Sequence, residues 1–417
     1  MLSTLNATAL MSPKLLIGAL SVVFLLPCLI SCLCCRLVIA IAPKIGMLDR
    51  PGERKIHTAP IPTDGGLGIW LATIIPCAAL TLLLCGYNSE LNTIWNVSIA
   101  QCPEAITIRF DGILARLTQL WILLALGSGL VILGVIDDRY GLPWQLRLGF
   151  EFLIAIVAVC CGWRADCFID NKLLASALSV LWIVTLINSF NLLDNMDALS
   201  GGVATICAFF LALVSLCYAP NAESGEPQYF LGAFLILLSG AISGFLTQNR
   251  PPAKIFMGDA GAYFIGFLLA TASLSMTYVG TDTPKTAVFV PIVVLATPLY
   301  DTISVVIVRL SHGKSPFVGD KNHYSHRLVA LGLSTKQAVA TIYLTTFVCA
   351  VGAVYLYQLN FLAASIVLIQ TVCIMSLIAI LEFAARRIIL QKSSEIAKTE
   401  EERLARAPHK SDTINRE

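Results

Sequence analysis

Residues 188–202 read NSFNLLDNMDALSGG, and they separate two long apolar runs, LLASALSVLWIVTLI at 173–187 and VATICAFFLALVSLCY at 203–218. Each apolar run is close to the roughly 20 residues that a helix needs to cross a bilayer. The polar stretch between them contains two aspartates and three asparagines, in a chain that otherwise avoids charge. The pattern predicts two membrane helices joined by a polar turn at the membrane boundary, and it raises the question of what the turn does.

The composition extends this prediction to the whole chain. Of the 417 residues, 57% are hydrophobic and 13% are charged, and the mean hydropathy is +0.79. Ordinary soluble domains carry roughly 25% charged residues, so a soluble protein is excluded. We predict an all-α, polytopic integral membrane protein, with about eleven transmembrane helices in residues 1–384 and a charged cytoplasmic tail in 385–417. The predicted spans are 15–42, 67–85, 117–136, 146–161, 173–190, 202–218, 229–246, 263–279, 288–310, 338–357 and 361–384.

The basic residues predict which side of the membrane each loop occupies. One side holds the tail and the loops 43–66, 137–145, 191–201, 247–262 and 311–337. Even without the tail, this side carries about twice as many Lys and Arg residues as the other, which identifies it as cytoplasmic. We therefore expect a multi-pass protein of the inner (cytoplasmic) membrane, whose dense polar clusters all face the cytoplasm.

Carboxylates gather at the ends of three predicted helices on that side. They are Asp137 and Asp138 after LVILGVI, Asp194 and Asp197 in the opening stretch, and Asp259 after IFMG. On a helix, the i, i+3 spacing of Asp194 and Asp197 puts them on one face, and Asn191 lies one turn earlier on that face. A helix N-cap would explain any single aspartate equally well. Several carboxylates from three helix ends instead predict a Mg²⁺ site that a substrate diphosphate completes, because Mg²⁺ takes oxygen ligands, substrate phosphates included.

Basic side chains accompany these carboxylates. Lys55 and His57 lie in the first cytoplasmic loop, and His323, His326 and Arg327 lie in the fifth. A diphosphate substrate and a phosphate-bearing lipid head group both need cations, so these residues are predicted to hold phosphates. Topology anchoring is the alternative for Lys55. A zinc site is the alternative for the two histidines, but no clear third ligand accompanies them.

Five cytoplasmic segments, in chain order, resemble those of the polyprenyl-phosphate N-acetylhexosamine-1-phosphate transferases, glycosyltransferase family 4. The segments are RKIHTAPIPTDGG, DDR, NSFNLLDNMDALSGG, KIFMGDAG and DKNHYSHRL. The resemblance covers about residues 49–330. The predicted number of spans is similar to the undecaprenyl-phosphate GlcNAc-1-phosphate transferase branch. The branch that transfers phospho-N-acetylmuramoyl-pentapeptide usually has fewer spans and a different first loop.

The resemblance implies a phosphoryl transfer. Undecaprenyl phosphate would attack the β-phosphorus of a UDP-N-acetylhexosamine, in the first instance UDP-GlcNAc. The products would be undecaprenyl-diphosphate-HexNAc, which initiates a cell-surface polysaccharide, and UMP. The implied cofactor is Mg²⁺, with Mn²⁺ as the alternative. Membrane lipid surrounds such a protein, no nucleic acid is implied as a partner, and a homodimer stays open.

The resemblance also implies roles for individual residues. Asp259 would be the Mg²⁺ ligand, and Asp137 would orient or deprotonate the lipid phosphate. The metal site or the nucleotide site would be shaped by Asp138, Asp194 and Asp197. Hydrogen bonds to the uridine or the metal shell would come from Asn191 and Asn249. Phosphates would be held by Lys55, His57, Arg327, His323 and His326. The two histidines form the implied catalytic set together with Asp137, Asp138, Asp194 and Asp197.

Departures from the family pattern leave alternatives open. Asn195 and Ala198 stand where the second acidic motif usually has glycine. One imidazole of the family's histidine motif is missing between His323 and His326, and Asp64 replaces a usually apolar residue. A non-catalytic family member acting as a scaffold therefore remains an alternative, as does the pentapeptide transferase. A secondary transporter is disfavoured, because the polar groups cluster at one interface rather than at the midplane of the membrane.

Asp301 lies inside the ninth predicted span, in ATPLYDTISVVIV. A carboxylate at that depth costs a few kcal/mol on insertion scales. We predict a polar partner or a groove beside Asp301, on the path of the lipid. A helix break at Pro298 would open this site, because irregular backbone in a membrane is tolerated where it lines a cavity.

Overall fold

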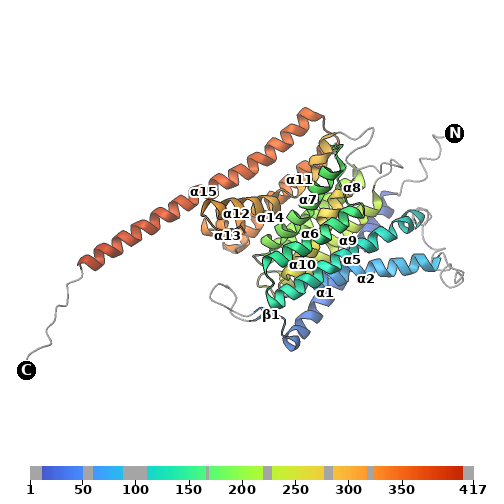
Figure 1. Ribbon diagram of the computed structural model, residues 1–417, viewed down its shortest axis with the longest axis horizontal. Coiled ribbons are helices and arrows are strands. Elements are labelled where there is room, and N and C mark those ends of the chain that lie inside the picture. Colours follow the sequence, from blue (N-terminus) through green and yellow to red (C-terminus); the bar gives the residue numbers. More distant parts are fainter. Residues whose placement is uncertain are drawn as a thin grey trace, which may run out of the picture.

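The computed structural model describes residues 12–49, 60–87, 110–165, 169–218, 228–276, 285–316 and 323–406. They form a bundle of long helices from which the C-terminal helix projects (Figure 1). The long helices are α1 (Pro13–Ile45), α2 (Gly65–Tyr87), α5 (Phe110–Tyr140), α6 (Trp144–Cys160), α7 (Lys172–Leu193), α8 (Leu199–Cys217), α9 (Tyr229–Asn249), α10 (Gly258–Leu274), α12 (Ala296–Ser311), α14 (Thr335–Val354) and α15 (Phe361–Arg406). The short helices are η1 (Lys285–Phe289), α11 (Val290–Val294), α13 (Tyr324–Ala330) and η2 (Tyr355–Tyr357). Strands β1 (Leu48–Asp49) and β2 (Ile61–Pro62) form a two-residue antiparallel pair, which the sequence analysis did not predict.

The prediction of a helical, polytopic membrane protein is confirmed. Within the described ranges, eight helices are long and apolar enough to cross a membrane. A ninth crossing would come from Lys285–Val294 and Ala296–Ser311, which are bent by 67° relative to each other. Helices α6 and α10 coincide with predicted spans but have only 17 residues each. The count of eleven spans therefore stays a prediction.

The bend lies inside the predicted span 288–310. Helix α11 ends at Val294 and α12 begins at Ala296. Pro298 lies in the first turn of α12, where the missing N–H costs no intrahelical hydrogen bond. A break beside Pro298 is therefore present. At the other end of the chain, α15 passes without interruption through the predicted tail boundary at 384/385.

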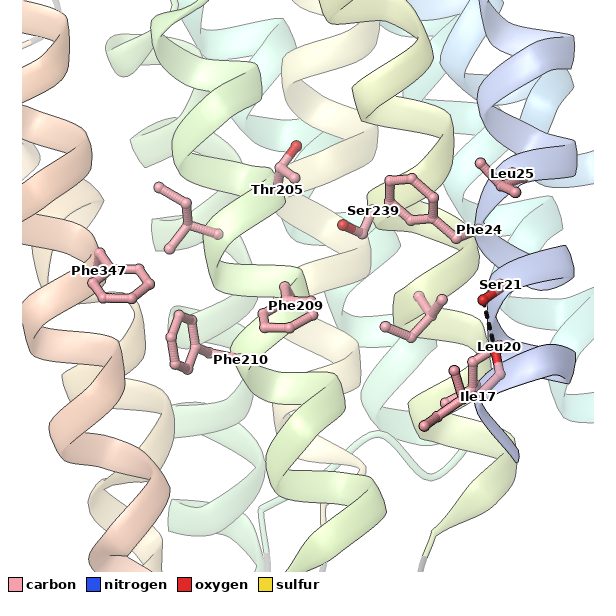
Figure 2. Close-up of a pocket in the computed structure, with 12 residues that line it drawn as sticks. Ile17, Leu20, Ser21, Phe24, Leu25, Thr205, Phe209, Phe210, Ser239 and Phe347 are labelled. Atoms are coloured by element: carbon pink, nitrogen blue, oxygen red, sulfur yellow. Dashed lines mark hydrogen bonds between the residues drawn. The ribbon is translucent and has the colours of Figure 1, made fainter. Parts of the chain in front are cut away.

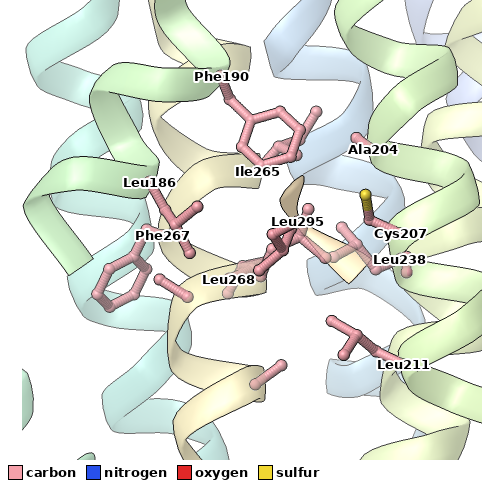
Figure 3. Close-up of a cluster of buried hydrophobic side chains, with 14 of the residues drawn as sticks. Leu186, Phe190, Ala204, Cys207, Leu211, Leu238, Ile265, Phe267, Leu268 and Leu295 are labelled. Carbon is pink, nitrogen blue, oxygen red and sulfur yellow. The ribbon is translucent and has the colours of Figure 1, made fainter. Parts of the chain in front are cut away.

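Helix α10 forms the centre of the bundle. All its residues from Ala260 to Ser273 are buried, and it packs against α2, α5, α7 and α8. Figure 3 shows Ile265, Phe267 and Leu268 of α10 among apolar side chains of the neighbouring helices. Small residues let helix backbones approach closely in membrane proteins. The position of α10 matters because its first turn carries Asp259.

At Gly134, helix α5 approaches the backbone of α10 closely. A Cβ at this position would lie 2.2 Å from the backbone N of Ala260 and 2.3 Å from its Cα. Gly134→Ala must therefore push α5 away from α10, and we expect a loss of about 1–3 kcal/mol in stability, as is typical of overpacking. Thermal unfolding of the detergent-purified protein measures this. The matched control is Gly149→Ala on α6, where a Cβ would meet nothing within 4 Å. Equal stability of the two variants would contradict this packing.

Candidate active site

Polar ends of three helices meet at one end of the bundle. Asp137 and Asp138 lie in the last turn of α5, Asn191 in the last turn of α7, and Asp259 in the first turn of α10. The Asn191 Nδ2 donates to Asp259 Oδ1 at 2.6 Å, and the backbone N–H of Asp259 donates to Asp138 Oδ2 at 3.0 Å. The structure thus brings together residues from three segments that the sequence analysis singled out separately.

Two further residues belong to this cluster, and the sequence analysis did not include them in the site. Arg147 of α6 donates to Asp137 Oδ2 at 2.8 Å and lies 3.7 Å from Asp259 Oδ2. The hydroxyl of Tyr263, on α10, donates to Asp137 Oδ2 at 3.1 Å and lies 3.3 Å from Asp259 Oδ2. Tyr263 stands four residues after Asp259, so its helical spacing could have revealed it. Arg147 stands at the start of a membrane helix, where its sequence position alone is explained equally well by membrane topology.

Asp137 is held more firmly than the other carboxylates. The backbone N–H of Leu142 donates to its Oδ1 at 2.7 Å, while Arg147 and Tyr263 donate to its Oδ2. Its side chain is 4% exposed, compared with 26% for Asp259. Asp137 is therefore a fixed acceptor, whereas Asp259 remains accessible to a ligand.

The loop between α7 and α8 forms a second wall. Asp197 Oδ2 accepts from the backbone N–H of Ala253 at 2.9 Å. Asn249 Oδ1 accepts from the backbone N–H of Ala198 at 2.8 Å, and Asn249 Nδ2 donates to the Ile255 carbonyl at 2.8 Å. Both polar groups of the Asn249 side chain thus bond within the protein. Asn249 braces this wall, and a role as a direct ligand of the uridine or metal shell stays a prediction.

Asp194, at the end of α7, shows the electrostatic character of the site. Burial and the nearby carboxylates of Asp259 and Asp197 raise the pKa of Asp194 to about 8. Neighbouring negative charges disfavour the ionised form of this carboxyl group, and a bound cation stabilises that form. The cluster is therefore suited to binding a cation.

The donor set fits Mg²⁺. The carboxylates of Asp259, Asp138 and Asp194 and the amide oxygen of Asn191 are hard oxygen donors, which this ion prefers. Within the described residues, no three His, Cys, Asp or Glu side chains form a complete metal cage. Mg²⁺ is commonly held by one or two carboxylates together with waters and substrate phosphates, so a complete protein cage is not required.

Asp64, one of the departures from the family pattern, lies beside this cluster. It is 1% exposed, and it accepts from the Thr63 hydroxyl at 2.9 Å through Oδ2. Burial raises the pKa of Asp64 above its usual range, and its charge also acts on Asp138. Asp64 therefore adds a further acidic group beside the site.

Ala198 adopts a backbone conformation that suits glycine better. Its φ is 64°, the one positive φ of a non-glycine residue in the described part of the chain, and its carbonyl accepts from the Tyr343 hydroxyl. The left-handed conformation costs a residue with a Cβ about 1–2 kcal/mol. Ala198 therefore carries backbone strain that a glycine at this position would avoid. Asn195 does not use this conformation, and its amide instead donates to the Leu192 carbonyl at 2.8 Å.

Substitutions at Ala198 are expected to change stability in opposite directions. Ala198→Gly should raise the unfolding free energy by up to about 1 kcal/mol, because relief of strain exceeds the entropic cost of glycine. Ala198→Val should lower it, since β-branched residues are outliers at positive φ. Thermal unfolding of both variants in detergent tests this, and a Val variant more stable than the Gly variant would refute it.

Asp301 has the polar partner that was predicted for it. This fully buried carboxylate of α12 lies with Oδ2 3.1 Å from His323 Nδ1, and its Oδ1 accepts from the backbone N–H of Tyr324 at 2.6 Å. Asp301 therefore holds the start of α13. A groove for the lipid beside it stays a prediction.

The remaining basic candidates lie along α13 or outside the described ranges. Ser325 donates to Asn195 Oδ1, which attaches α13 to the loop between α7 and α8. The ring centroids of His323 and His326 lie 6.3 Å apart. Arg327 Nε lies 2.9 Å from Glu382 Oε2 on α15. Lys55 and His57 belong to residues 50–59, which lie outside the described part of the chain.

An apolar cavity of about 670 Å³ lies elsewhere, among α1, α8, α9 and α14. Phe24, Phe209, Phe210 and Phe347 line it, with Ser239 among its few polar groups (Figure 2). None of the residues that line it belongs to the polar cluster. The chemistry therefore concentrates at the helix ends rather than in this cavity.

The part of the chain that carries this site is similar to known proteins. Residues 120–277, which include all five candidate carboxylates, match the glycosyl transferase family 4. The chain is 29% identical, over 81% of its length and 85% of the relative's, to a protein of Bacillus subtilis (strain 168) described as a probable undecaprenyl-phosphate N-acetylglucosaminyl 1-phosphate transferase. It is 27% identical to the decaprenyl-phosphate N-acetylglucosaminephosphotransferase of Mycobacterium tuberculosis (strain ATCC 25618 / H37Rv), over 75% of this chain and 76% of the relative. It is 25% identical to the undecaprenyl-phosphate alpha-N-acetylglucosaminyl 1-phosphate transferase of Escherichia coli (strain K12), over 72% and 74%. The part of the chain that carries the polar cluster thus matches glycosyl transferase family 4, and over most of its length the chain is similar to polyprenyl-phosphate N-acetylglucosamine-phosphate transferases.

Proposed function

We propose that this protein transfers N-acetylglucosamine-1-phosphate from UDP-N-acetylglucosamine to undecaprenyl phosphate and releases UMP. The names of the three relatives support the acceptor class and the transferred group. The structural observation that carries the proposal is the convergence of Asp137, Asp138 and Asp259 beside Arg147 at the ends of membrane helices. Such a site can meet a lipid phosphate from the membrane and a nucleotide sugar from water.

The chemistry asks for positioning and charge neutralisation more than for covalent help. Mg²⁺ held at Asp259 would neutralise the donor diphosphate and stabilise the departing UMP. The hydrogen bond from Asn191 fixes Asp259, and the N-terminus of α10 favours negative charge at the same place. These residues orient the donor so that its β-phosphorus faces the acceptor.

Asp137 and Arg147 serve the acceptor in this proposal. A phosphate monoester has a second pKa near about 6, so at neutral pH most of the acceptor is already a dianion. Asp137, fixed by three donors, orients the acceptor. Arg147 neutralises the phosphate charge as it approaches the carboxylates.

We further propose that the site faces the cytoplasm from the inner membrane and that its product initiates a cell-surface polysaccharide. The excess of Lys and Arg in the loops beside the site supports this orientation. Cysteines introduced as Asp170→Cys, at the opposite end of the bundle, and as Arg139→Cys, beside the site, test this orientation in intact cells. A membrane-impermeant thiol reagent should label the cysteine at position 170 and not the one at position 139.

A panel of donors tests the reaction itself. Purified protein in detergent receives undecaprenyl phosphate, Mg²⁺ and one of several UDP-sugars, and UMP release is followed. The proposal predicts UMP release with UDP-N-acetylglucosamine. UMP release only with UDP-N-acetylmuramoyl-pentapeptide would support the pentapeptide transferase instead. Binding of donors without release of UMP would support a scaffold.

A further inference from the structure

Glu382 is the charged residue in the apolar part of α15. It is 9% exposed, while its neighbours Leu381 and Phe383 are 54% and 70% exposed. Only 11% of the apolar stretch of α15 is buried against the rest of the protein. Glu382 therefore lies on the narrow side of α15 that faces the bundle, where the helix passes α12 and α13 (Figure 1).

The contacts of Glu382 lead to the segment that carries the candidate histidines. Its Oε2 lies 2.9 Å from Arg327 Nε of α13 and accepts from the Tyr300 hydroxyl of α12 at 2.9 Å. Arg327 Nη2 donates to Ser304 Oγ of α12 at 2.6 Å. Because two nitrogens of a rigid, planar guanidinium are fixed in this way, its plane is fixed too.

Helix α13 depends on such contacts because it has only seven residues. A helix of this length is not stable by itself. Asp301 holds its start through His323 and Tyr324, and Glu382 holds it one turn later through Arg327. The geometry of the whole segment therefore rests on two buried carboxylates, one of them on the C-terminal helix.

We propose that Glu382 is a positioning residue, through which α15 fixes Arg327 and α13 for binding the diphosphate of the donor sugar nucleotide. This inference rests on the proposed function, and it makes α15 a part of the active site rather than only a membrane anchor. The donor is the substrate concerned, since α13 is attached through Ser325 to the loop of the second acidic motif. The acceptor, in contrast, is assigned to Asp137 and Arg147.

The test separates positioning from simple attachment of α15. Glu382→Gln keeps the shape and the hydrogen bond to Tyr300 but removes the charge. We expect kcat/KM for UDP-N-acetylglucosamine to fall about 100-fold, as small misplacements do, while KM for undecaprenyl phosphate stays unchanged. Glu382→Asp should recover part of the loss. Gln370→Leu, at an exposed position of the same helix, is the control and should behave as the unaltered protein.

A charge exchange provides the second readout. The double variant Arg327→Glu/Glu382→Arg restores the ion pair but puts a carboxylate where the donor needs a cation. We expect its thermal stability in detergent to return toward that of the unaltered protein, without any return of transfer. Recovery of transfer along with stability would show that the pair only attaches α15, and unaltered kinetics of Glu382→Gln would also overturn the proposal.

Failure of the proposed function can be told apart from failure of this inference. If the unaltered protein transfers nothing, calorimetric affinity for UDP-N-acetylglucosamine with Mg²⁺ decides the inference. Binding that weakens about 100-fold in Glu382→Gln would support it even in a protein without turnover. Equal affinity in both proteins, or no binding by either, would overturn it.

Discussion

Asp259→Ala is expected to lower kcat/KM for transfer by at least about 1,000-fold. The substitution removes the accessible carboxylate at the start of α10, and with it the charge that would hold Mg²⁺ beside the donor diphosphate. Loss of a single electrostatic contact to a transition state costs about 100- to 1,000-fold, and a metal contributes several kcal/mol. Both effects act together at this residue.

The size of the effect on folding should be small by comparison. Asp259 is 26% exposed at its side chain, and removing it leaves Asp137 paired with Arg147. Asp170→Ala, an exposed aspartate before α7, is the matched control and should keep full activity. Transfer by Asp259→Ala within tenfold of the unaltered rate would show that the metal is held elsewhere.

Arg147→Ala is expected to lower kcat/KM by about 100- to 1,000-fold, the cost of removing one preorganised charge from the site. The guanidinium stands between Asp137 and Asp259, and without it the acceptor phosphate would meet uncompensated negative charge. Arg147→Lys should lose less, because it keeps the charge but not the planar fork. Steady-state rates at varied undecaprenyl phosphate measure both variants.

Thermal unfolding must accompany these rates. Asp137 is 4% exposed, and a buried carboxylate that loses its partner costs about 3–5 kcal/mol. Arg147→Ala is therefore expected to be less stable than Arg147→Lys. The control is Arg139→Ala, an exposed residue at the end of α5. If Arg147→Ala retained normal acceptor kinetics while Arg139→Ala did not, the roles assigned to the two arginines would be wrong.

Much of the fold could be predicted because apolar runs near the length of a membrane span are a local signal. The helix ends carrying Asp137, Asn191 and Asp259 could be placed from the same signal. Features that depend on a partner from a distant part of the chain could not be predicted from the sequence. The bend between α11 and α12 lies beside a proline, but a proline in the sequence does not specify the angle of 67°.

The site shows the same division. The carboxylates were found because charge is conspicuous in an apolar chain. Arg147 was missed because its partners Asp137 and Asp259 come from other helices, and an arginine at a helix start is explained equally well by topology. Glu382 was missed because its partner Arg327 comes from a separate segment of the chain. Asn249 was found, but only the structure shows that its amide is used inside the protein.

The most direct test of the account follows the phosphorus atoms of the donor. UDP-N-acetylglucosamine labelled at its β-phosphorus is given to the purified protein with undecaprenyl phosphate and Mg²⁺. The account predicts that the label enters the lipid phase, that UMP appears without label, and that EDTA or Asp259→Ala abolishes both. Label that stays in water as UDP while the sugar enters the lipid would mean a glycosyl transfer, and it would contradict the attack on phosphorus proposed here.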